Sequence, residues 1–246
     1  MDGPDDELKD LSDTFDSLLA RPEAAFDSQR RFIANASHEL RTPLAGQRAA
    51  LQIGLEDPSP EELAEVRQAL LDSNRRSERL LDSLLTLAKG ERGVERFEPF
   101  DLGQVTRQEA TAAEALAEEH AVTLEVTVPR PLRGGPALMA TLVGNLLRNA
   151  VLYNRPGGTV EVRCTADALT VRNTGPRVPA EEVASLFEPF RRGRDLDRRA
   201  GRGEGLGLSI VAAVARAHGA TTTATANPDG GLTIGVRLPA GDTPAG

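Results

Sequence analysis

Two long helical repeats of apolar residues, separated by one proline-rich break, constrain the fold of this chain more than any other feature. Between Leu8 and Leu55 apolar side chains recur at alternating spacings of three and four residues, and only Pro22 and Gln29 interrupt the pattern. The segment "EDPSPEEL" then ends this helix at its Asp-Pro pair, because a residue before proline disfavours helical dihedrals. The first repeat therefore predicts one long helix with a defined end.

A second helix is predicted directly after the break. Ser59 and Glu62 have the spacing of a capping box, and Pro60 occupies the first helical position. The apolar stripe then continues to about Lys89, and Gly90 is the predicted end. A helical hairpin of this length cannot bury both stripes alone, so we expect two copies to pair into a four-helix bundle, making a homodimer. A hairpin packed on the rest of its own chain is the alternative.

The composition narrows the class of protein. Hydrophobic residues make up 39% and charged residues 27% of the 246 residues, as in soluble proteins, and we expect no membrane span in this chain. The net charge of -8 argues against nucleic acid as a partner, because phosphate backbones require a basic surface. The single cysteine, Cys164, excludes an internal disulfide and is consistent with the cytosol. The acidic start "DGPDDELKD" does not have the pattern of a secretory leader.

Beyond Gly93 the pattern changes to mixed helices and strands, after the polar linker "KGERGVER". Two β-hairpins are predicted, "GTVEVRC" with "ALTVRN" and "TTTATA" with "LTIGVRL", and "FEPFDL" and "VTLEVTV" are further strands. The predicted helices cover about 102–119, 136–152, 180–187 and 206–218. This order predicts an α+β sandwich with strands in one layer and helices in the other.

The stretch "NASHELRTPL" places a chemically distinctive cluster within the first long helix. His38 and Thr42 are four residues apart and share a helix face, with Glu39 about 100° round the axis. Pro43 lacks an N–H group and should bend the helix just beyond the histidine. Neutral imidazole is a nucleophile near pH 7, and a neighbouring carboxylate can orient or take the second ring proton. The cluster suits transfer of an electrophilic group to a ring nitrogen; a solvated face carrying histidine by chance is the alternative.

Five motifs, in order, resemble those of sensor histidine kinases of two-component signalling. "FIANASHELRTPL" resembles the phosphoacceptor box, "NLLRNAVLYN" the asparagine box, "VRNTGPRVP" the first glycine box, "LFEPFRRG" the phenylalanine box and "GEGLGLSIVAAVARAHG" the second glycine box. The resemblance implies a multi-domain α and α+β protein. Its helical-hairpin dimerisation and phosphotransfer domain covers 26–92, and an ATP-binding α/β sandwich of the GHKL (Bergerat) type covers 97–240.

The same resemblance implies a longer receptor. Residues 1–25 resemble the end of a membrane-proximal (HAMP-like) relay helix, with transmembrane sensor segments upstream of the sequence given. The resemblance then places the chain at the cytoplasmic side of the cell membrane. The implied partner is the receiver domain of a response regulator.

The resemblance also assigns site residues, each with a physical reason. His38, Glu39 and Thr42 are the implied catalytic group, and Asn149 the implied Mg²⁺ ligand, because an amide oxygen adds no negative charge beside a triphosphate. Alternating glycines before a helix let the backbone approach phosphate closely. The implied ATP-binding residues are Asn145, Asn149, Tyr153, Asn173, Gly175, Arg192, Gly203, Gly205 and Gly207. For the two asparagines of the asparagine box, the alternative is that they are polar residues at a helix-packing seam. The arginine-rich segment "RRGRDLDRRAGRG" is predicted to be a lid, and a charged loop is the alternative.

Three positions depart from the family pattern. Asn173 stands where an aspartate usually receives the adenine amino group, Arg177 replaces a glycine, and Leu152 replaces a lysine. We expect weaker or less selective adenine binding, because an amide oxygen still accepts a hydrogen bond but carries no charge. The implied function is autophosphorylation of His38 from ATP, transfer to a response-regulator aspartate, and dephosphorylation of that regulator. A catalytically silent dimeric scaffold is the alternative; the histidine box argues against a chaperone or mismatch-repair ATPase.

Overall fold

The computed structural model describes residues 29–52, 59–94, 97–127, 131–165, 168–191 and 205–239. The chain divides into two compact units, Met1–Ser77 and Glu78–Gly246, and the second unit includes the C-terminal turns of helix α2. The segment predicted as a relay helix, 1–25, lies outside the described residues. Among the helices that are described, none is both long and apolar enough to span a bilayer.

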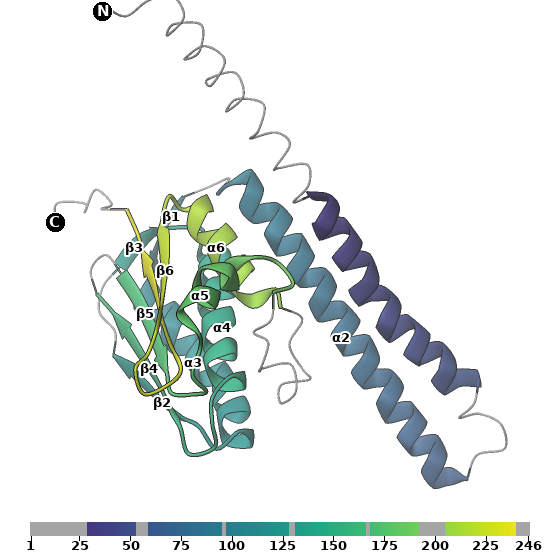
Figure 1. Cartoon of the computed structure of the whole chain (residues 1–246). Coiled ribbons are helices and arrows are strands. Elements are labelled where there is room, and N and C mark those ends of the chain that lie inside the picture. The colour runs from purple at the N-terminus through teal and green to yellow at the C-terminus, as the bar shows by residue number, and fades with distance from the viewer. Residues whose placement is uncertain are drawn as a thin grey trace, which may run out of the picture. The chain divides into compact units, whose positions relative to one another are not determined.

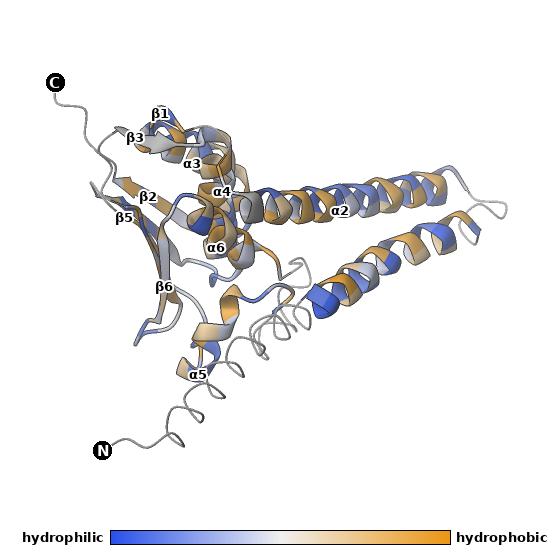
Figure 2. Cartoon of the chain, turned by 90° about the horizontal axis from the view of Figure 1, so that it is seen from above, coloured by the Kyte–Doolittle hydropathy of each residue, from blue (hydrophilic) through white to orange (hydrophobic). Residues whose placement is uncertain are grey.

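The predicted helical hairpin is confirmed. A first helix covers residues 29–52, and α2 covers Pro60–Arg92 (Figure 1). The capping box is formed as predicted: the Ser59 N–H donates to Glu62 Oε2 at 2.8 Å, and the Glu62 N–H donates to Ser59 Oγ at 3.2 Å. These hydrogen bonds favour the carboxylate and lower the pKa of Glu62. Polar and apolar residues alternate along α2 as expected for an amphipathic helix (Figure 2).

The first helix continues through Pro43 to residue 52 without interruption. Within the first unit, the buried Ser73 of α2 donates from Oγ to the Pro43 carbonyl oxygen at 3.3 Å. This bond ties the two helices together one turn beyond His38.

The predicted end of α2 at Gly90 is wrong, since the helix continues to Arg92. Gly93 has φ +86, the left-handed conformation that terminates helices, and its N–H donates to the Gly90 carbonyl at 3.4 Å. Gly90 instead serves packing within the second unit. A Cβ atom there would lie 3.0 Å from the backbone carbon and the Cβ of Ala213 in α6, so only glycine permits this close approach.

The second unit contains a five-stranded sheet with helices over one of its faces (Figure 1). The strand order is β2-β4-β5-β7-β6, in which β2 runs parallel to β4 and the other pairs are antiparallel. The bounds of these strands are β2 Thr123–Thr127, β4 Thr159–Cys164, β5 Ala168–Asn173, β6 Thr221–Ala226 and β7 Leu232–Arg237. The helices are α3 Leu102–Glu119, α4 Pro136–Leu152, α5 Ala180–Val183, the 3₁₀ helix η1 Ala184–Phe187 and α6 Gly207–Ala217. The two predicted β-hairpins and the α/β sandwich are confirmed.

A second, two-stranded sheet was not predicted in full. The expected strand at "FEPFDL" is β1, Glu98–Asp101, and it pairs antiparallel with β3, Pro131–Gly134, which the sequence did not indicate. Asp101 caps α3 by accepting from the Gly103 N–H at 2.7 Å. The Asp101 side chain therefore caps the N–H group of the second residue of α3.

The core lies between the sheet and the helices α4 and α6, where apolar residues concentrate (Figure 2). Alternate residues of β4 and β5 point inward, so Val162 faces Val171 and Cys164 faces Leu169 across the pair. Burial, with a smaller contribution from Asp101, raises the pKa of the Cys164 thiol to about 11. Cys164 is thus a core residue.

His218 is a buried residue that connects two helices of the second unit. It caps α6 and is only 4% exposed. Its Nε2 accepts from the Gly135 N–H at 2.9 Å, and its Nδ1 lies 2.8 Å from the Val214 carbonyl oxygen. Both ring nitrogens therefore lie within hydrogen-bonding distance of backbone groups. The ring joins the start of α4 to the end of α6.

Candidate functional site

A cavity of about 540 Å³ lies within the second unit. Its walls come from α4, the ends of β5 and β7, the start of α6 and the last turns of α2. The predicted site residues that line it are Asn145, Asn149, Tyr153, Asn173, Gly205 and Gly207. Arg192 and Gly203 lie outside the described residues. Predicted site residues from three separate motifs therefore line one cavity of nucleotide size.

The two box asparagines have different environments on α4. Asn145 turns its amide back along the helix, and Nδ2 donates to the Thr141 carbonyl at 2.8 Å. Asn149 lies against the first residue of α6: a Cβ on Gly207 would meet its Nδ2 at 2.6 Å and its Oδ1 at 2.8 Å. Asn149 is therefore the asparagine held at the N-terminus of α6, where backbone N–H groups favour negative charge.

Gly207→Ala should weaken nucleotide binding without unfolding the protein. The three atoms nearest to the new methyl group would all belong to the Asn149 amide, which can rotate away, so we expect Asn149 to be displaced while the fold persists. We expect a loss of ADP affinity on the order of tenfold by calorimetry. Gly46→Ala is the matched control, because its Cβ would enter open space; it should leave ADP affinity unchanged. Wild-type affinity in Gly207→Ala would contradict this reading.

Gly205 and Phe190 contact each other just before the start of α6, and both have unusual backbone conformations. Gly205 has φ +70 and Phe190 has φ +62, which is rare for a bulky residue. The Phe190 N–H donates to the Gly205 carbonyl at 2.8 Å, and a Cβ on Gly205 would lie 2.9 Å from the Phe190 carbonyl carbon. The phenylalanine box and second glycine box thus form one strained turn, a feature typical of ligand sites.

The turn between β6 and β7 forms a wall of the cavity, which the sequence did not indicate. Asn227 donates from Nδ2 to the Asn173 carbonyl oxygen at 3.0 Å, and the Gly231 N–H donates to the Pro176 carbonyl at 2.8 Å. Gly231 has φ +84 and lines the cavity itself. From the sequence, "NPDGG" is expected only to form the turn of the second predicted hairpin, because its partners in the first glycine box are far away in the sequence.

Gly175 does not line the cavity but positions its neighbours. A Cβ at this residue would lie 2.6 Å from the Tyr153 carbonyl oxygen and 3.2 Å from Asn173 Nδ2. Glycine is required here for the first glycine box to approach the end of α4.

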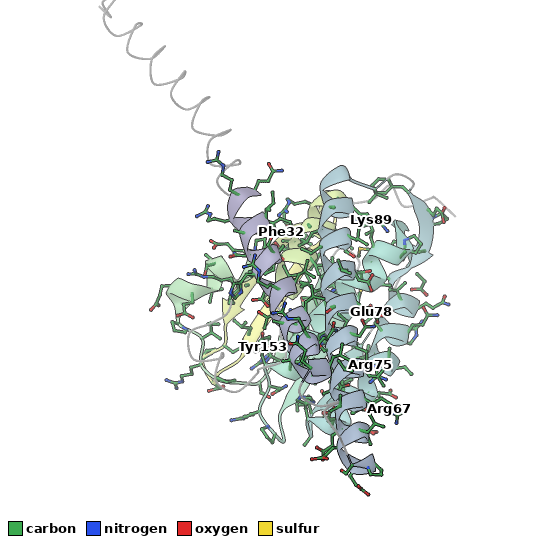
Figure 3. The ribbon with its side chains drawn as sticks, turned by 90° about the vertical axis from the view of Figure 1, so that its right-hand side faces the viewer. Phe32, Arg67, Arg75, Glu78, Lys89 and Tyr153 are labelled. Atoms are coloured by element: carbon green, nitrogen blue, oxygen red, sulfur yellow. The ribbon has the colours of Figure 1, made fainter. Side chains whose placement is uncertain are left out.

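The described charges of the cavity wall are mostly positive. Arg79, Lys89, Arg148 and Arg191 line it, against one acidic side chain, Asp82. Lys89 lies in the last turns of α2 and Tyr153 just beyond α4 (Figure 3). In a chain of net charge -8, this local excess favours an anionic ligand. The sequence motifs do not indicate Arg79 or Lys89, because neither residue lies in a recognised motif. Arg191 lies within the phenylalanine box, next to Arg192, but the resemblance assigns no role to it.

The rest of the wall is apolar and suits a flat ring. Val171 and Ile234 from the sheet, and Leu146, Ala150 and Ile210 from the helices, are buried and line the cavity. A smaller cavity of about 260 Å³ adjoins α4 and is lined by Glu109, Thr141, Gly144, Asn145 and other residues. Partial burial raises the pKa of Glu109.

The predicted catalytic cluster lies in the first unit. His38 and Thr42 are exposed on the first helix, and Glu39 is half-buried. The Thr42 hydroxyl donates to the His38 carbonyl oxygen at 3.2 Å, which places the two residues on one face, as predicted. The described geometry leaves the imidazole accessible to a ligand.

Two family models match the chain in the order of these units. Residues 28–93 match the "His Kinase A (phospho-acceptor) domain". Residues 134–242 match the "Histidine kinase-, DNA gyrase B-, and HSP90-like ATPase" family. The chain belongs to the sensor histidine kinases.

Individual relatives agree with this membership. The sensor protein CutS of Streptomyces coelicolor is 46% identical over 97% of this chain and 59% of its own length. The probable sensor histidine kinase TcrY of Mycobacterium tuberculosis is 33% identical, over 94% of this chain and 50% of TcrY. This sensor histidine kinase chain therefore spans little more than half the length of these curated relatives.

A histidine kinase of known structure, solved in a complex, has a similar fold. The crystal structure of histidine kinase ThkA with the response regulator protein TrrA has a TM-score of 0.66 and 20% identity, over 86% of this chain and 61% of that one. This likeness concerns the fold.

Proposed function

We propose that this chain is the cytosolic kinase core of a sensor histidine kinase, with a hairpin phosphotransfer domain over 26–92 and an ATP-binding domain over 97–240. The γ-phosphoryl group of ATP is transferred to a ring nitrogen of His38: the bond from the β–γ bridging oxygen to phosphorus breaks, a phosphorus–nitrogen bond forms, and ADP leaves. The observation that carries the proposal is the cavity, which joins an apolar slot to a cationic rim and a glycine-led helix start.

Residues of both units have roles in this step. A ring nitrogen of His38 attacks as the neutral imidazole, and Glu39 holds or takes the proton of the other ring nitrogen. Asn149 would hold Mg²⁺, which offsets phosphate charge when bound, and Asn145 and Tyr153 complete the nucleotide site. Arg192 and Gly203 adjoin the terminal phosphates in this proposal.

The donor set is compatible with Mg²⁺. Asn149 offers a neutral amide oxygen beside the start of α6, and the cavity wall carries only one acidic side chain among its described residues. Such a site leaves most of the metal's coordination to phosphate oxygens and water, as magnesium in nucleotide sites prefers.

The hairpin is the proposed homodimer interface. Five large apolar side chains of the first unit are between 43% and 57% exposed, which is unusual for a solvated surface: Ile33, Leu44, Leu51, Leu63 and Leu71. Pairing with a second hairpin would bury them in a four-helix bundle.

The proposed partner of phosphorylated His38 is the receiver domain of a response regulator, whose aspartate takes the phosphoryl group. ThkA, which shares this fold, forms a complex with such a regulator. The full-length protein is proposed to be a membrane receptor with this core on the cytoplasmic side, because the chain spans only part of its sensor relatives.

The test is incubation of the chain with γ-labelled ATP and Mg²⁺, followed by analysis of acid-labile, alkali-stable label on the protein. Label on His38, located by peptide mapping, supports the proposal. Nucleotide binding without label would instead identify a silent dimeric scaffold, for which Asn173 and Leu152 are the motivating departures.

Thr42→Ala should separate two activities. From the turn after His38, the Thr42 hydroxyl can align a water for in-line attack on the regulator's aspartyl phosphate, whereas autophosphorylation needs no such water. We expect near-normal label on His38 and a dephosphorylation rate lower on the order of tenfold. The measurement is decay of purified phosphorylated regulator with the variant and ADP.

Ser37→Ala is the matched control for this prediction. The Ser37 hydroxyl also donates to a carbonyl one turn back, Ile33 O at 2.8 Å, so its removal deletes the same kind of helix bond. Equal decay with both variants would show Thr42 to be a bystander. Equal loss of label and of decay in Thr42→Ala would make its role structural.

A further inference from the structure

Asn173 is the buried polar side chain of the cavity. Among the described lining residues it is the single polar one below a tenth exposed, at 7%, and it lies at the end of β5 beside the apolar slot. A ring seated against Val171 and Ile234 would therefore present its edge to this amide. Because buried polar groups require hydrogen-bond partners, the amide determines which hydrogen-bonding groups the edge of a bound ring can carry.

Backbone groups on both sides fix the orientation of this amide. Nδ2 donates to the Thr174 carbonyl at 2.7 Å, and Oδ1 accepts from the Leu232 N–H at 3.2 Å. A flipped amide would oppose donor to donor at Leu232 and acceptor to acceptor at Thr174. The environment thus determines which atom is nitrogen and which is oxygen.

Each end of the amide retains capacity for one more hydrogen bond. A carboxamide oxygen accepts two and a carboxamide nitrogen donates two, and the backbone uses one of each. Asn173 thus offers a ligand both a donor and an acceptor. Adenine carries a donor at its 6-position, the amino group, whereas guanine and hypoxanthine carry an acceptor there, the oxo group.

We infer that Asn173 makes this site tolerant at the purine 6-position, so that 6-oxopurine nucleotides bind with an affinity comparable to that of adenine nucleotides. The inference rests on the proposed function, which makes the cavity a nucleotide site. An aspartate at this position would offer acceptors alone and would reject the oxo group. It would also set an oxygen against the Thr174 carbonyl, where Nδ2 now donates.

The test compares dissociation constants of ADP, IDP and GDP for the 246-residue chain by titration calorimetry. These diphosphates cannot support phosphorylation, and IDP differs from ADP in its 6-oxo group and the accompanying N1 proton, without the 2-amino group of GDP. We expect the ADP and IDP constants to agree within about fivefold. In Asn173→Asp, the ratio of the IDP dissociation constant to the ADP dissociation constant should rise by on the order of tenfold or more.

Two further variants make the comparison specific. Asn154→Asp changes the same chemical group outside the cavity, at a residue that donates to the Thr159 carbonyl, and should leave the ratio unchanged. Asn173→Ser retains a hydroxyl that donates and accepts, so its ratio should stay near that of the wild type. The wild-type ratio needs no variant and tests the inference even where Asn173→Asp fails to fold.

The outcomes are distinguishable. A wild-type preference for ADP over IDP of a hundredfold or more overturns the inference and leaves the kinase proposal standing. An unchanged ratio in folded Asn173→Asp also overturns it, because the 6-position then does not meet Asn173. Failure of all three nucleotides to bind overturns the inference together with the proposed function.

Discussion

His38→Gln should reduce phosphorylation of the chain from labelled ATP to background. Transfer requires a nitrogen lone pair that attacks phosphorus, and the nitrogen of a glutamine amide is not nucleophilic because its lone pair is delocalised. The effect is chemical and not structural. His38 is exposed on the first helix, and glutamine is a good helix former, so the hairpin should form normally.

Three measurements make this result specific. ADP binding by calorimetry should be unchanged, because the cavity belongs to the other unit. The mass measured by light scattering should remain that of a dimer. His120→Gln applies the same substitution at the end of α3, where the ring Nδ1 donates to the Leu116 carbonyl oxygen, and should retain full label. Acid-labile label on His38→Gln would contradict the assignment of the phosphoacceptor.

Elements with local end signals were predictable from the sequence. α4 begins with Pro136 and α3 follows the cap at Asp101, and both helices have the predicted bounds. The capping box at Ser59 formed as its spacing indicated. These signals act within one turn of the chain, so a reading of the sequence alone can find them.

Features that depend on distant partners were not predictable in the same way. β3 became a strand because β1 pairs with it, and its own residues have no strand pattern. Gly90 resembled a helix end, yet its conformational freedom is used to approach Ala213, far along the chain. His218 joins the end of α6 to the start of α4 because the Gly135 N–H donates to its Nε2. In each case a tertiary contact decides the role of the residue.

The candidate site shows the same division. The motifs predicted one shared site for the asparagines and the glycines at the start of α6, and these residues line one cavity because each motif lies at the end of a regular element that faces the cavity. Lys89 and the turn at Gly231 carry no local signal of a ligand site, and they join the cavity only through packing. Their role follows from the fold.

Asn149→Asp should lower the rate of autophosphorylation by about a hundredfold or more, equivalent to about 2.7 kcal/mol in the barrier. The two side chains have the same shape, so the contact with Gly207 and the α4 packing are retained. The carboxylate, however, adds a negative charge beside the triphosphate, and the one acidic side chain now lining the described cavity is Asp82. Binding of the anionic nucleotide is then opposed by direct repulsion, and Mg²⁺ is drawn toward the protein and away from the phosphates.

The dependence on metal separates this explanation from a general loss of binding. The rate should be measured across Mg²⁺ concentrations, and ADP affinity should be measured with and without Mg²⁺. In the wild type, Mg²⁺ should raise the affinity for ADP. In Asn149→Ala, this gain in affinity should be lost. Asn145→Ala is the matched control, since the Asn145 amide is already bonded to Thr141 and its loss should leave the Mg²⁺ gain intact. Normal turnover of Asn149→Ala at limiting Mg²⁺ would show that another group holds the metal, and a Mg²⁺ gain lost in Asn145→Ala alone would move the ligand one turn back along α4.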